Sequence, residues 1–316
     1  MMLLPVGRMY IRMESAMSII VDKISYVYEA GTGFERRALD NVSCAINDGE
    51  FVGLIGHTGS GKSTFIQHLN GLLKATEGHI YFNGQDIYDA GFNMKELRSR
   101  VGLVFQYPEH QLFETEIFKD VCFGPKNLGL SQKEVEIRAF ESLRLVGIDD
   151  NMFYQSPFDL SGGQKRRVAI AGVLAMKPDV LILDEPTAGM DPEERIRIRN
   201  FISGCAKDKI VLLATHVVAD VENMAREILL IKNGKIVRRD TPQKLLAELE
   251  HKVYNVLVTE REGEEYQNSG ARIISVTLTE KGHRLRIISA DALKTGNVEE
   301  VYPCLEDVYL YWIDRE

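Results

Sequence analysis

The glycine-rich segment 56–63, Gly-His-Thr-Gly-Ser-Gly-Lys-Ser, constrains the fold of this chain more than any other stretch. It follows an apolar, strand-like run at 51–55 and precedes a run with helical periodicity at 62–73. A strand, a loop of the pattern G-x-x-x-x-G-K-[ST] and a helix in this order form a phosphate-binding loop in α/β proteins. The glycines let backbone N–H groups converge on phosphate oxygens, and the helix adds the positive end of its dipole. The segment therefore predicts a nucleotide site at the edge of a sheet.

This segment, called the phosphate loop below, carries two side chains with expected roles. Lys62 should reach the β and γ phosphates of ATP, and the Ser63 hydroxyl should ligate Mg²⁺. A structural glycine-rich turn is the alternative, but average residue usage produces this pattern in only about one in a hundred chains of this length. His57 stands at a variable position of the pattern and has no expected catalytic role. The predicted ATP-binding residues of the loop are Gly56, His57, Thr58, Gly59, Ser60, Gly61, Lys62, Ser63 and Thr64.

Two adjacent carboxylates, Asp184 and Glu185, end an apolar run at 180–183. Ligands bind at the carboxyl ends of the strands in parallel α/β sheets, so both side chains should face the nucleotide. Asp184 is predicted to hold Mg²⁺, and Glu185 to polarise the attacking water as general base. Taken alone, such a dipeptide is more often a solvated pair at a strand end. A phosphate loop in the same sheet favours the catalytic interpretation.

A second anion-binding helix start is encoded at 160–164, called the signature turn below. Its residues are Leu160, Ser161, Gly162, Gly163 and Gln164. Ser161 could simply cap the helix that follows, but a cap does not require the two glycines. One nucleotide cannot readily use two such helix ends from one subunit. We therefore expect two-fold pairing, in which the signature turn of each subunit covers the ATP held by the other.

Buried strands that alternate with helices predict a largely parallel sheet covered on both faces. Within this α/β pattern, a helix is expected at 219–225, and residues 107–160 are expected to form an inserted helical subdomain. The tail reads as three strands and a closing helix, at 252–259, 273–279, 285–288 and 305–312. The predicted organisation is an N-terminal extension at 1–16, an ATP-binding domain at 17–245 and a small α/β accessory domain at 246–316.

Charge, cysteine content and hydropathy limit which class of protein this chain can belong to. The net charge of −8 and the pI near 5.5 argue against a protein that grips nucleic acid, because that affinity comes from Lys and Arg on phosphates. Four scattered cysteines without a CxxC pattern predict reduced thiols. No apolar run approaches the ~20 residues that a membrane-spanning helix needs. If a membrane is involved, the chain should dock onto another protein within it.

Residues 17–245 resemble the nucleotide-binding domain of ABC transporters, because the phosphate loop, signature turn and acidic pair occur in that family's order. The resemblance implies the P-loop NTPase fold of that domain, a mixed sheet with a helical subdomain, and ATP and Mg²⁺ as cofactors. It also implies further roles. Gln106 corresponds to the glutamine that contacts Mg²⁺ and the water, His216 to the histidine on the γ phosphate, Asp191 to the loop that crosses the dimer interface, and Tyr28 to the aromatic residue stacked on adenine.

Segments 56–73 and 105–127 resemble the ATP-binding subunits of energy-coupling factor importers, which take up vitamins and transition-metal ions. This resemblance implies a second ABC ATPase subunit, identical or different, as partner. It further implies a transmembrane coupling or permease subunit, a substrate-binding membrane subunit, and a location on the cytoplasmic face of a bacterial-type membrane. Nucleic acid is not an expected partner.

From about Thr215 onward, and especially at 252–316, the chain resembles instead the ATPases of bacitracin-type exporters, so a drug or peptide exporter is one alternative. The importer is favoured because the helical subdomain and the loop after Gln106 contact the membrane partner in this superfamily, and both fall in the importer-like part. A non-transport ABC ATPase is the other alternative. DNA-repair members insert a long coiled coil before Ser161, whereas this interval is compact. A regulator that no longer hydrolyses ATP would lack Glu185 or His216, and both are present.

Overall fold

The computed structural model describes residues 3–6, 9–12, 18–206, 209–259, 262–264, 266, 272–280, 282–289 and 297–313. The chain divides into two compact units, 1–236 and 237–316. The boundary expected between residues 245 and 246 stays a prediction. Among the described residues, no helix combines the length and the apolar character needed to cross a lipid bilayer.

A six-stranded sheet has the strand order β12-β11-β5-β10-β9-β8; five of its strands lie in the first unit, and β12 crosses the boundary at residue 236. The pairs from β11 through β5, β10 and β9 to β8 are all parallel. Strands β5, β9 and β10 are buried along their whole length, which explains their continuous apolar runs. The bounds are β5 Phe51–Ile55, β8 Val101–Val104, β9 Val180–Asp184, β10 Ile210–Thr215, β11 Glu227–Lys232 and β12 Lys235–Asp240.

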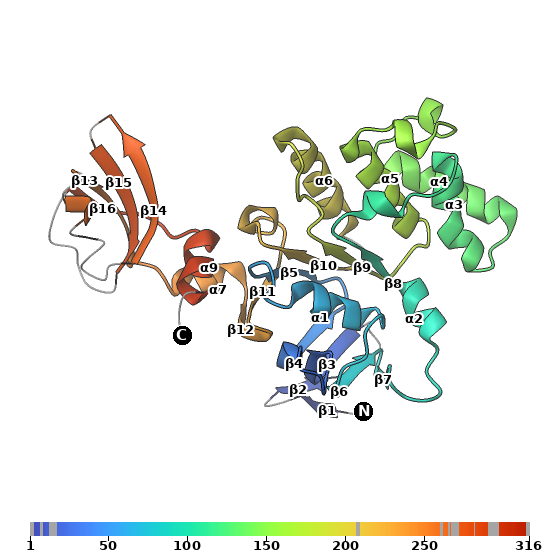
Figure 1. Cartoon of the computed structure of the whole chain (residues 1–316), viewed down its shortest axis with the longest axis horizontal. Helices are drawn as coiled ribbons and strands as arrows, with labels where there is room; N and C mark the ends of the chain where they lie inside the picture. The colour runs from blue at the N-terminus through green and yellow to red at the C-terminus, as the bar shows by residue number, and fades with distance from the viewer. Residues whose placement is uncertain are drawn as a thin grey trace. The chain divides into compact units, whose positions relative to one another are not determined.

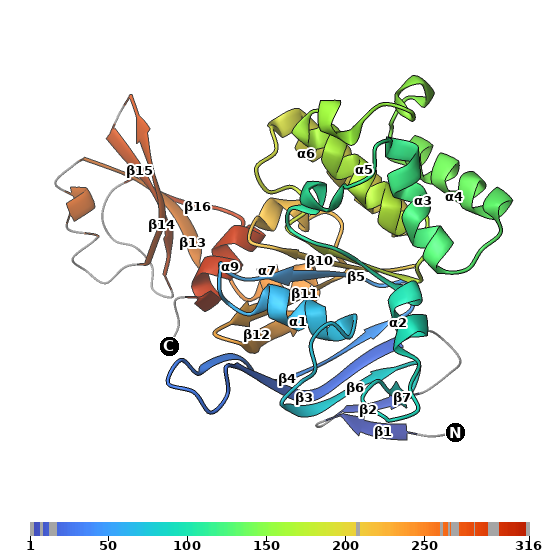
Figure 2. The ribbon, with the colours of Figure 1, turned by 45° about the vertical axis from the view of Figure 1, so that its right-hand side comes forward.

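An antiparallel sheet with the order β4-β3-β6-β7 forms a second layer of this unit. Its strands are β3 Ser18–Tyr28, β4 Arg36–Asn47, β6 Glu77–Phe82 and β7 Gln85–Asp86, and a separate two-stranded sheet pairs β1 Leu3–Val6 with β2 Met9–Arg12. Asn83 and Gly84 adopt φ of 50° and 79° and form the two-residue hairpin turn between β6 and β7. Helix α1 (Lys62–Leu69) lies between the two sheets (Figure 2) and buries Phe65 and Ile66 in their common core.

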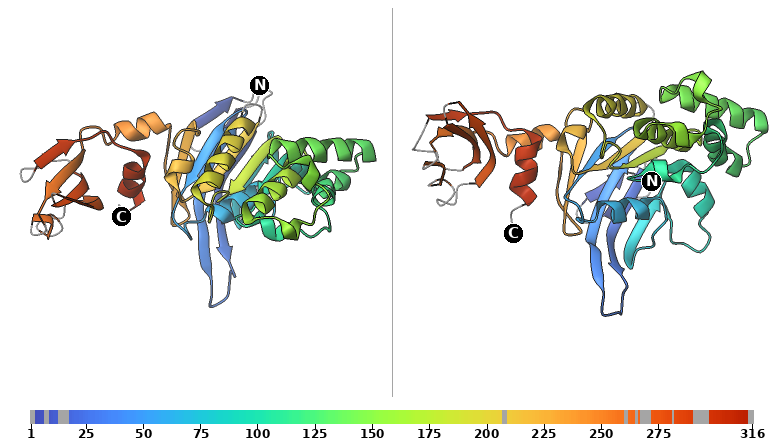
Figure 3. Two further views of the ribbon diagram at one scale, coloured as in Figure 1. Left: turned by 90° about the horizontal axis from the view of Figure 1, so that it is seen from above. Right: turned by 45° about the horizontal axis from the view of Figure 1, so that its top comes forward.

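The expected helical subdomain is present, and its helices α3, α4 and α5 gather beside one end of the six-stranded sheet (Figure 1). Helix α6 covers the face of that sheet opposite α1 (Figure 1; Figure 3, left). The helices of this unit are α2 Met94–Arg100, α3 Ile117–Asn127, α4 Gln132–Leu145, α5 Gly162–Leu174 and α6 Pro192–Cys205, with short 3-10 turns η1 Pro108–Gln111, η2 Asp150–Met152, η3 Pro157–Asp159 and η4 Val218–Asp220.

The prediction of a helix at 219–225 is wrong. This stretch forms only η4 followed by turns, and the Asp220 side chain is fully buried and hydrogen-bonded to the Thr187 hydroxyl. That contact joins residues far apart in the sequence, so local periodicity could not reveal it. It fixes the segment after β10 in an irregular conformation.

The second unit contains a curved antiparallel sheet with the order β14-β15-β13-β16 (Figure 3). The helices and strands of this unit are α7 Pro242–Ala247, β13 Val253–Val258, β14 Arg272–Thr279, β15 Gly282–Ile288, β16 Asn297–Glu300 and α9 Leu305–Ile313. The three predicted strands and the closing helix are present, whereas β16 was not expected. Val256, Leu285 and Ile287 form its core. On α9, the Asp307 carboxylate is fully buried and binds the Arg286 guanidinium.

Candidate nucleotide site

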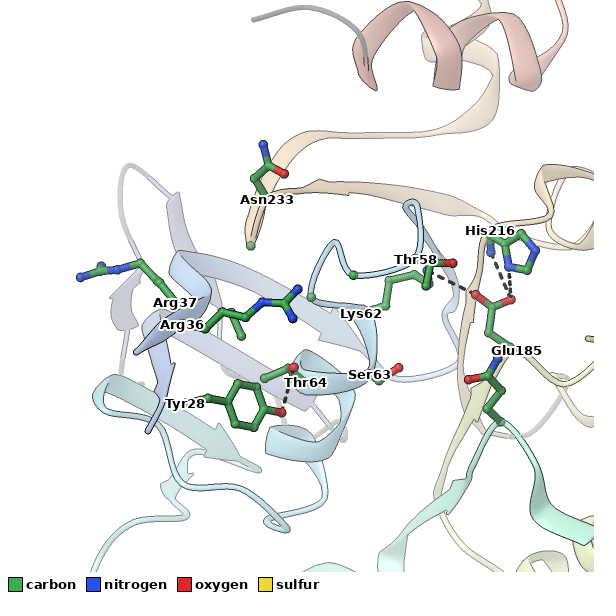
Figure 4. Close-up of a pocket in the computed structure, with 15 residues that line it drawn as sticks. Tyr28, Arg36, Arg37, Thr58, Lys62, Ser63, Thr64, Glu185, His216 and Asn233 are labelled. Atoms are coloured by element: carbon green, nitrogen blue, oxygen red, sulfur yellow. Dashed lines mark hydrogen bonds and ion pairs between the residues drawn. The ribbon is translucent and has the colours of Figure 1, made fainter. Parts of the chain in front are cut away.

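A cleft of about 430 Å³ opens above the phosphate loop (Figure 4). Ten of the predicted site residues line it, from both sheets, α1 and the ends of β8, β9 and β10: Tyr28, Thr58, Gly59, Gly61, Lys62, Ser63, Thr64, Gln106, Glu185 and His216. The fold therefore brings together side chains that lie far apart in the sequence.

The phosphate loop leaves the start of α1 without a side-chain cap. The N-cap position is Gly61, with φ of 107°, and glycine has no side chain that could accept from the first-turn N–H groups. A Cβ at Gly61 would lie 2.6 Å from the Ala38 carbonyl oxygen, and one at Gly56 would lie 2.5 Å from the Ile231 carbonyl oxygen. Both glycines are thus required by packing. The bare helix end is a site for an anion.

Lys62 is buried at the floor of the cleft. Its Nζ donates to the carbonyl oxygens of Gly56 at 2.7 Å and His57 at 3.2 Å. It also lies 3.2 Å from Oε1 of Glu185. The ammonium is therefore held between the loop and the carboxylate that follows β9.

Glu185 has an unusual backbone for a residue with a long side chain, with φ of 47°. Its N–H donates to the Ala214 carbonyl at 2.8 Å, which continues the pairing of β9 with β10. Its Oε2 accepts from the Thr215 hydroxyl at 3.1 Å and from the His216 backbone at 3.2 Å, and lies 2.8 Å from His216 Nδ1. A carboxylate can only accept, so Nδ1 carries the proton of that contact. The ring remains partly exposed at the cleft.

Asp184 and Ser63 fit a magnesium ion. Asp184 is 3% exposed, and its Oδ1 has no hydrogen-bond partner among the described residues. Burial raises the pKa of this carboxyl, while a hydrogen bond from Ser63 opposes the rise. Carboxylate and hydroxyl oxygens are hard donors that suit Mg²⁺, whose remaining ligands are usually phosphates and water.

Tyr28 lines the cleft, whereas its neighbour Tyr26 packs against the core. The Tyr28 hydroxyl lies 3.2 Å from the Thr64 hydroxyl, and the ring meets Tyr26 edge-on with the centroids 4.8 Å apart. The ring is therefore held beside the phosphate loop by two separate contacts (Figure 4).

The signature turn and Asp191 lie outside the residues that line this cleft. Ser161 does cap α5, since its hydroxyl accepts from Gln164 N–H at 3.3 Å and the Gln164 side chain accepts from Ser161 N–H at 2.9 Å. An added Cβ at Gly162 would meet no atom within 4 Å. The fold of one chain therefore does not require a glycine there. Asp191 caps α6, its carboxylate accepting from Glu194 N–H at 2.9 Å.

Five further residues of the cleft were not predicted: Arg36, Arg37, Ala38, Asn233 and Gly234. The Arg36 side chain extends toward the phosphate loop (Figure 4), and a Cβ on Gly59 would lie 3.5 Å from its Nη2. Gly234 N–H donates to the Ser60 carbonyl at 2.9 Å. The Asn233-Gly234 dipeptide signals a hairpin turn, but the sequence holds no signal for what that turn packs against.

Similarity to known proteins agrees with this site. The ABC transporter family matches residues 39–188. The energy-coupling factor transporter ATP-binding protein EcfA2 of Caldanaerobacter subterraneus subsp. tengcongensis is 52% identical over 237 residues, which cover 74% of this chain and 82% of that protein. The protein of the same name in Clostridioides difficile is 52% identical over 232 residues, covering 72% and 81%.

Two solved structures are also similar. One is cbiO1 from Clostridium perfringens, part of the ABC transporter complex cbiONQ, with a TM-score of 0.65, 36% identity, and coverage of 73% of this chain and 90% of that one. The other is a dimeric post-hydrolysis state of the ATP-binding cassette MJ0796 bound to ADP and Pi, with a TM-score of 0.64, 29% identity, and coverage of 71% and 98%. The chain therefore belongs to the ABC transporter family, as an ATPase of the energy-coupling factor transporter ATP-binding group.

Proposed function

We propose that the cleft binds Mg²⁺–ATP, and that a second ABC subunit completes the site with its own signature turn. Closing and reopening of this dimer then drives import of a vitamin or a transition-metal ion through a membrane subunit. The observation that carries the proposal is the position of Glu185, between Lys62 and His216 at the phosphate loop. The same cleft also contains Gln106 and Ser63.

The residues of the cleft and Asp184, which does not line it, divide the work of hydrolysis among them. Lys62 and the bare end of α1 bind the β and γ phosphates, where charge develops as the bond breaks. Asp184, Ser63 and Gln106 would hold Mg²⁺, which neutralises charge on the phosphates when bound. Glu185 accepts a proton from the attacking water, and His216 orients that carboxylate through Nδ1. Tyr28 stacks on the adenine.

Contribution of the signature turn from a partner rests on two observations. The turn is absent from the described residues that line the cleft, and Gly162 has free space around it that the fold of one chain does not use. A glycine next to a helix start allows close approach of an anion. The similar MJ0796 cassette is itself dimeric. An arrangement in which Asp191 and the turn face a second subunit accounts for all of these features.

A groove on the helical subdomain offers a surface to the membrane subunit. It runs between α2, α3 and α5 and includes the loop after Gln106. Phe113 and Phe123 line it and stack edge-to-face, and their side chains are 56% and 47% exposed. Exposed apolar side chains gathered in one groove are typical of a contact with another protein. A peripheral location at the membrane follows from such docking.

Two experiments test the proposal. Glu185→Gln should abolish ATP turnover and accumulate ATP-bound dimers, while Glu193→Gln, on the exposed side of α6, should leave turnover unchanged. Unchanged hydrolysis by Glu185→Gln would exclude Glu185 as the base. Co-purification from detergent-solubilised native membranes should recover a second ABC ATPase and an importer-type membrane subunit. Recovery of an exporter permease instead would refute the import assignment.

A further inference from the structure

Arg166 on α5 is a buried and fully paired side chain outside the cleft. Arg166 is only 4% exposed and is not among the residues that line the cleft. An arginine has five N–H donors. Nε and Nη2 donate to the two carboxylate oxygens of Glu109, at 3.1 and 3.0 Å. Nη2 also donates to the backbone carbonyl of Gln106 at 3.3 Å. Nη1 donates to the backbone carbonyls of Ala188 at 2.6 Å and Pro186 at 3.4 Å. Every donor therefore has its own acceptor.

These acceptors belong to segments that matter to the cleft. Gln106 and Glu109 are on the turn that follows β8 and opens toward the helical subdomain. Pro186 and Ala188 directly follow Glu185 and lead to Asp191. Arg166 itself lies on the helix that begins at the signature turn. Three of the five contacts go to backbone carbonyls, so the guanidinium fixes the course of the main chain.

Stability alone is a weak reason for such a group. A buried ion pair can often be replaced by apolar side chains of similar volume without loss of stability. A planar guanidinium is distinguished instead by the fixed directions of its donors, which an ammonium group cannot reproduce. A guanidinium with donors in fixed directions is therefore suited to setting the relative positions of the three chain segments that it contacts.

We propose that Arg166 is a positioning residue for ATP hydrolysis. It holds the Gln106 turn and the Glu185 turn in fixed register with the signature turn, so that the three act as one body. This inference rests on the proposed function of those three segments. Because Arg166 contacts none of the phosphate-loop residues, it should affect turnover far more than nucleotide affinity.

Arg166→Lys is the test. The lysine keeps the charge near Glu109 but cannot reach the three carbonyls in the same plane. A misplacement of about 1 Å at a catalytic group can cost about a hundredfold in rate, so we expect kcat to fall about ten- to hundredfold with KM for ATP changed less than about threefold. Hydrogen exchange should rise in segments 106–109 and 186–190 and stay unchanged in α1.

The matched control is Arg138→Lys on α4. Arg138 also pairs with a carboxylate, Glu134, and a backbone carbonyl, that of Met176, but it lies outside the cleft and its three segments. It should keep full turnover. If Arg166→Lys fails to fold, Glu109→Gln replaces it as the test. This change keeps an oxygen that can accept from Arg166 and leaves the three carbonyl contacts in place, so kcat should fall by less than in Arg166→Lys.

Unchanged kcat in Arg166→Lys, or equal losses of kcat and nucleotide affinity, would overturn the positioning role. The outcome is separable from that of the proposed function. If Glu185→Gln abolishes turnover and Arg166→Lys does not alter it, only the inference on Arg166 fails. If Glu185→Gln keeps its turnover, the proposed function itself fails.

Discussion

The change Gly162→Ala separates what one chain needs in order to fold from what a pair of chains needs for hydrolysis. An added methyl group at this position meets no atom within 4 Å, and the backbone is not left-handed. Gly162 is the first residue of α5. Alanine exceeds glycine in helix propensity by up to about 1 kcal/mol, and somewhat less at a helix end. The variant should therefore fold at least as stably as the original chain.

Turnover should move in the opposite direction. If the signature turn of one subunit approaches the γ phosphate bound by the other, the methyl group occupies the space that the phosphate needs. Loss of one hydrogen bond from a site that stabilises developing negative charge costs about 10²- to 10³-fold in rate. We expect a loss of that order. The assay is steady-state ATP hydrolysis together with thermal unfolding of the same preparation.

The matched control is Gly204→Ala. Gly204 also lies on a helix, α6, and its added methyl group also meets nothing within 4 Å. It should show the same small gain in stability with unchanged turnover. If Gly162→Ala hydrolyses ATP at the original rate, the signature turn does not approach a nucleotide and the two-subunit site is refuted.

Three further predictions concern charges. Lys62→Ala removes hydrogen bonds to phosphate worth about 1.5–3 kcal/mol, so calorimetry should show ATP binding weakened about ten- to a hundredfold; unchanged affinity would contradict the role of the loop. Burial raises the pKa of Asp184, so protons should displace Mg²⁺ at a higher pH than for an ordinary carboxyl. Mg²⁺ affinity should fall as the pH is lowered and lose that dependence in Asp184→Asn; a flat profile in the original chain would refute this. Arg286→Met strands the buried Asp307 carboxylate and should destabilise the second unit by about 3–5 kcal/mol in hydrogen exchange, whereas the exposed Arg284→Met should not; equal protection in both variants would show that the pair contributes nothing.

The stability of the second unit should also depend on pH. Burial raises the pKa of Asp307, but the hydrogen bonds from Arg286 and from Cys304 N–H outweigh it, and the net effect lowers this pKa. The contribution of a carboxyl with a lowered folded-state pKa is present above its unfolded-state pKa and is lost as the pH falls through the folded-state value. Asp307 should therefore stabilise the unit at neutral pH and fail to do so in acid.

The sequence predicted the parts of the site that depend on short segments. The phosphate loop and the acidic pair each follow a continuous apolar run, and both elements sit where that pattern indicates. Tyr28 was chosen by the family resemblance and not by its local pattern, because which of Tyr26 and Tyr28 reaches the cleft depends on how β3 pairs with β4. Arg36 and the Asn233-Gly234 turn were missed for the same reason: strand pairing across long sequence separations brings them to the loop.

Irregular and edge segments were the least predictable part of the fold. The stretch at 219–225 has helical composition, yet the buried Asp220 is held by Thr187 from another part of the chain. Strand β16 contains Asn297 and two glutamates, residues that are depleted in strands, and it forms only because β13 offers an edge. In both cases tertiary contacts decide the local conformation.

The glycine at the start of α1 has a consequence for the thermodynamics of the whole first unit. Helices α5 and α6 carry side-chain caps, whereas α1 leaves its first-turn N–H groups to solvent or to an anion. A ligand that fills this end binds the folded chain and not the unfolded one, and at a hundred times its dissociation constant it adds about 2.7 kcal/mol to stability. The melting temperature of this unit should therefore rise with the nucleotide concentration.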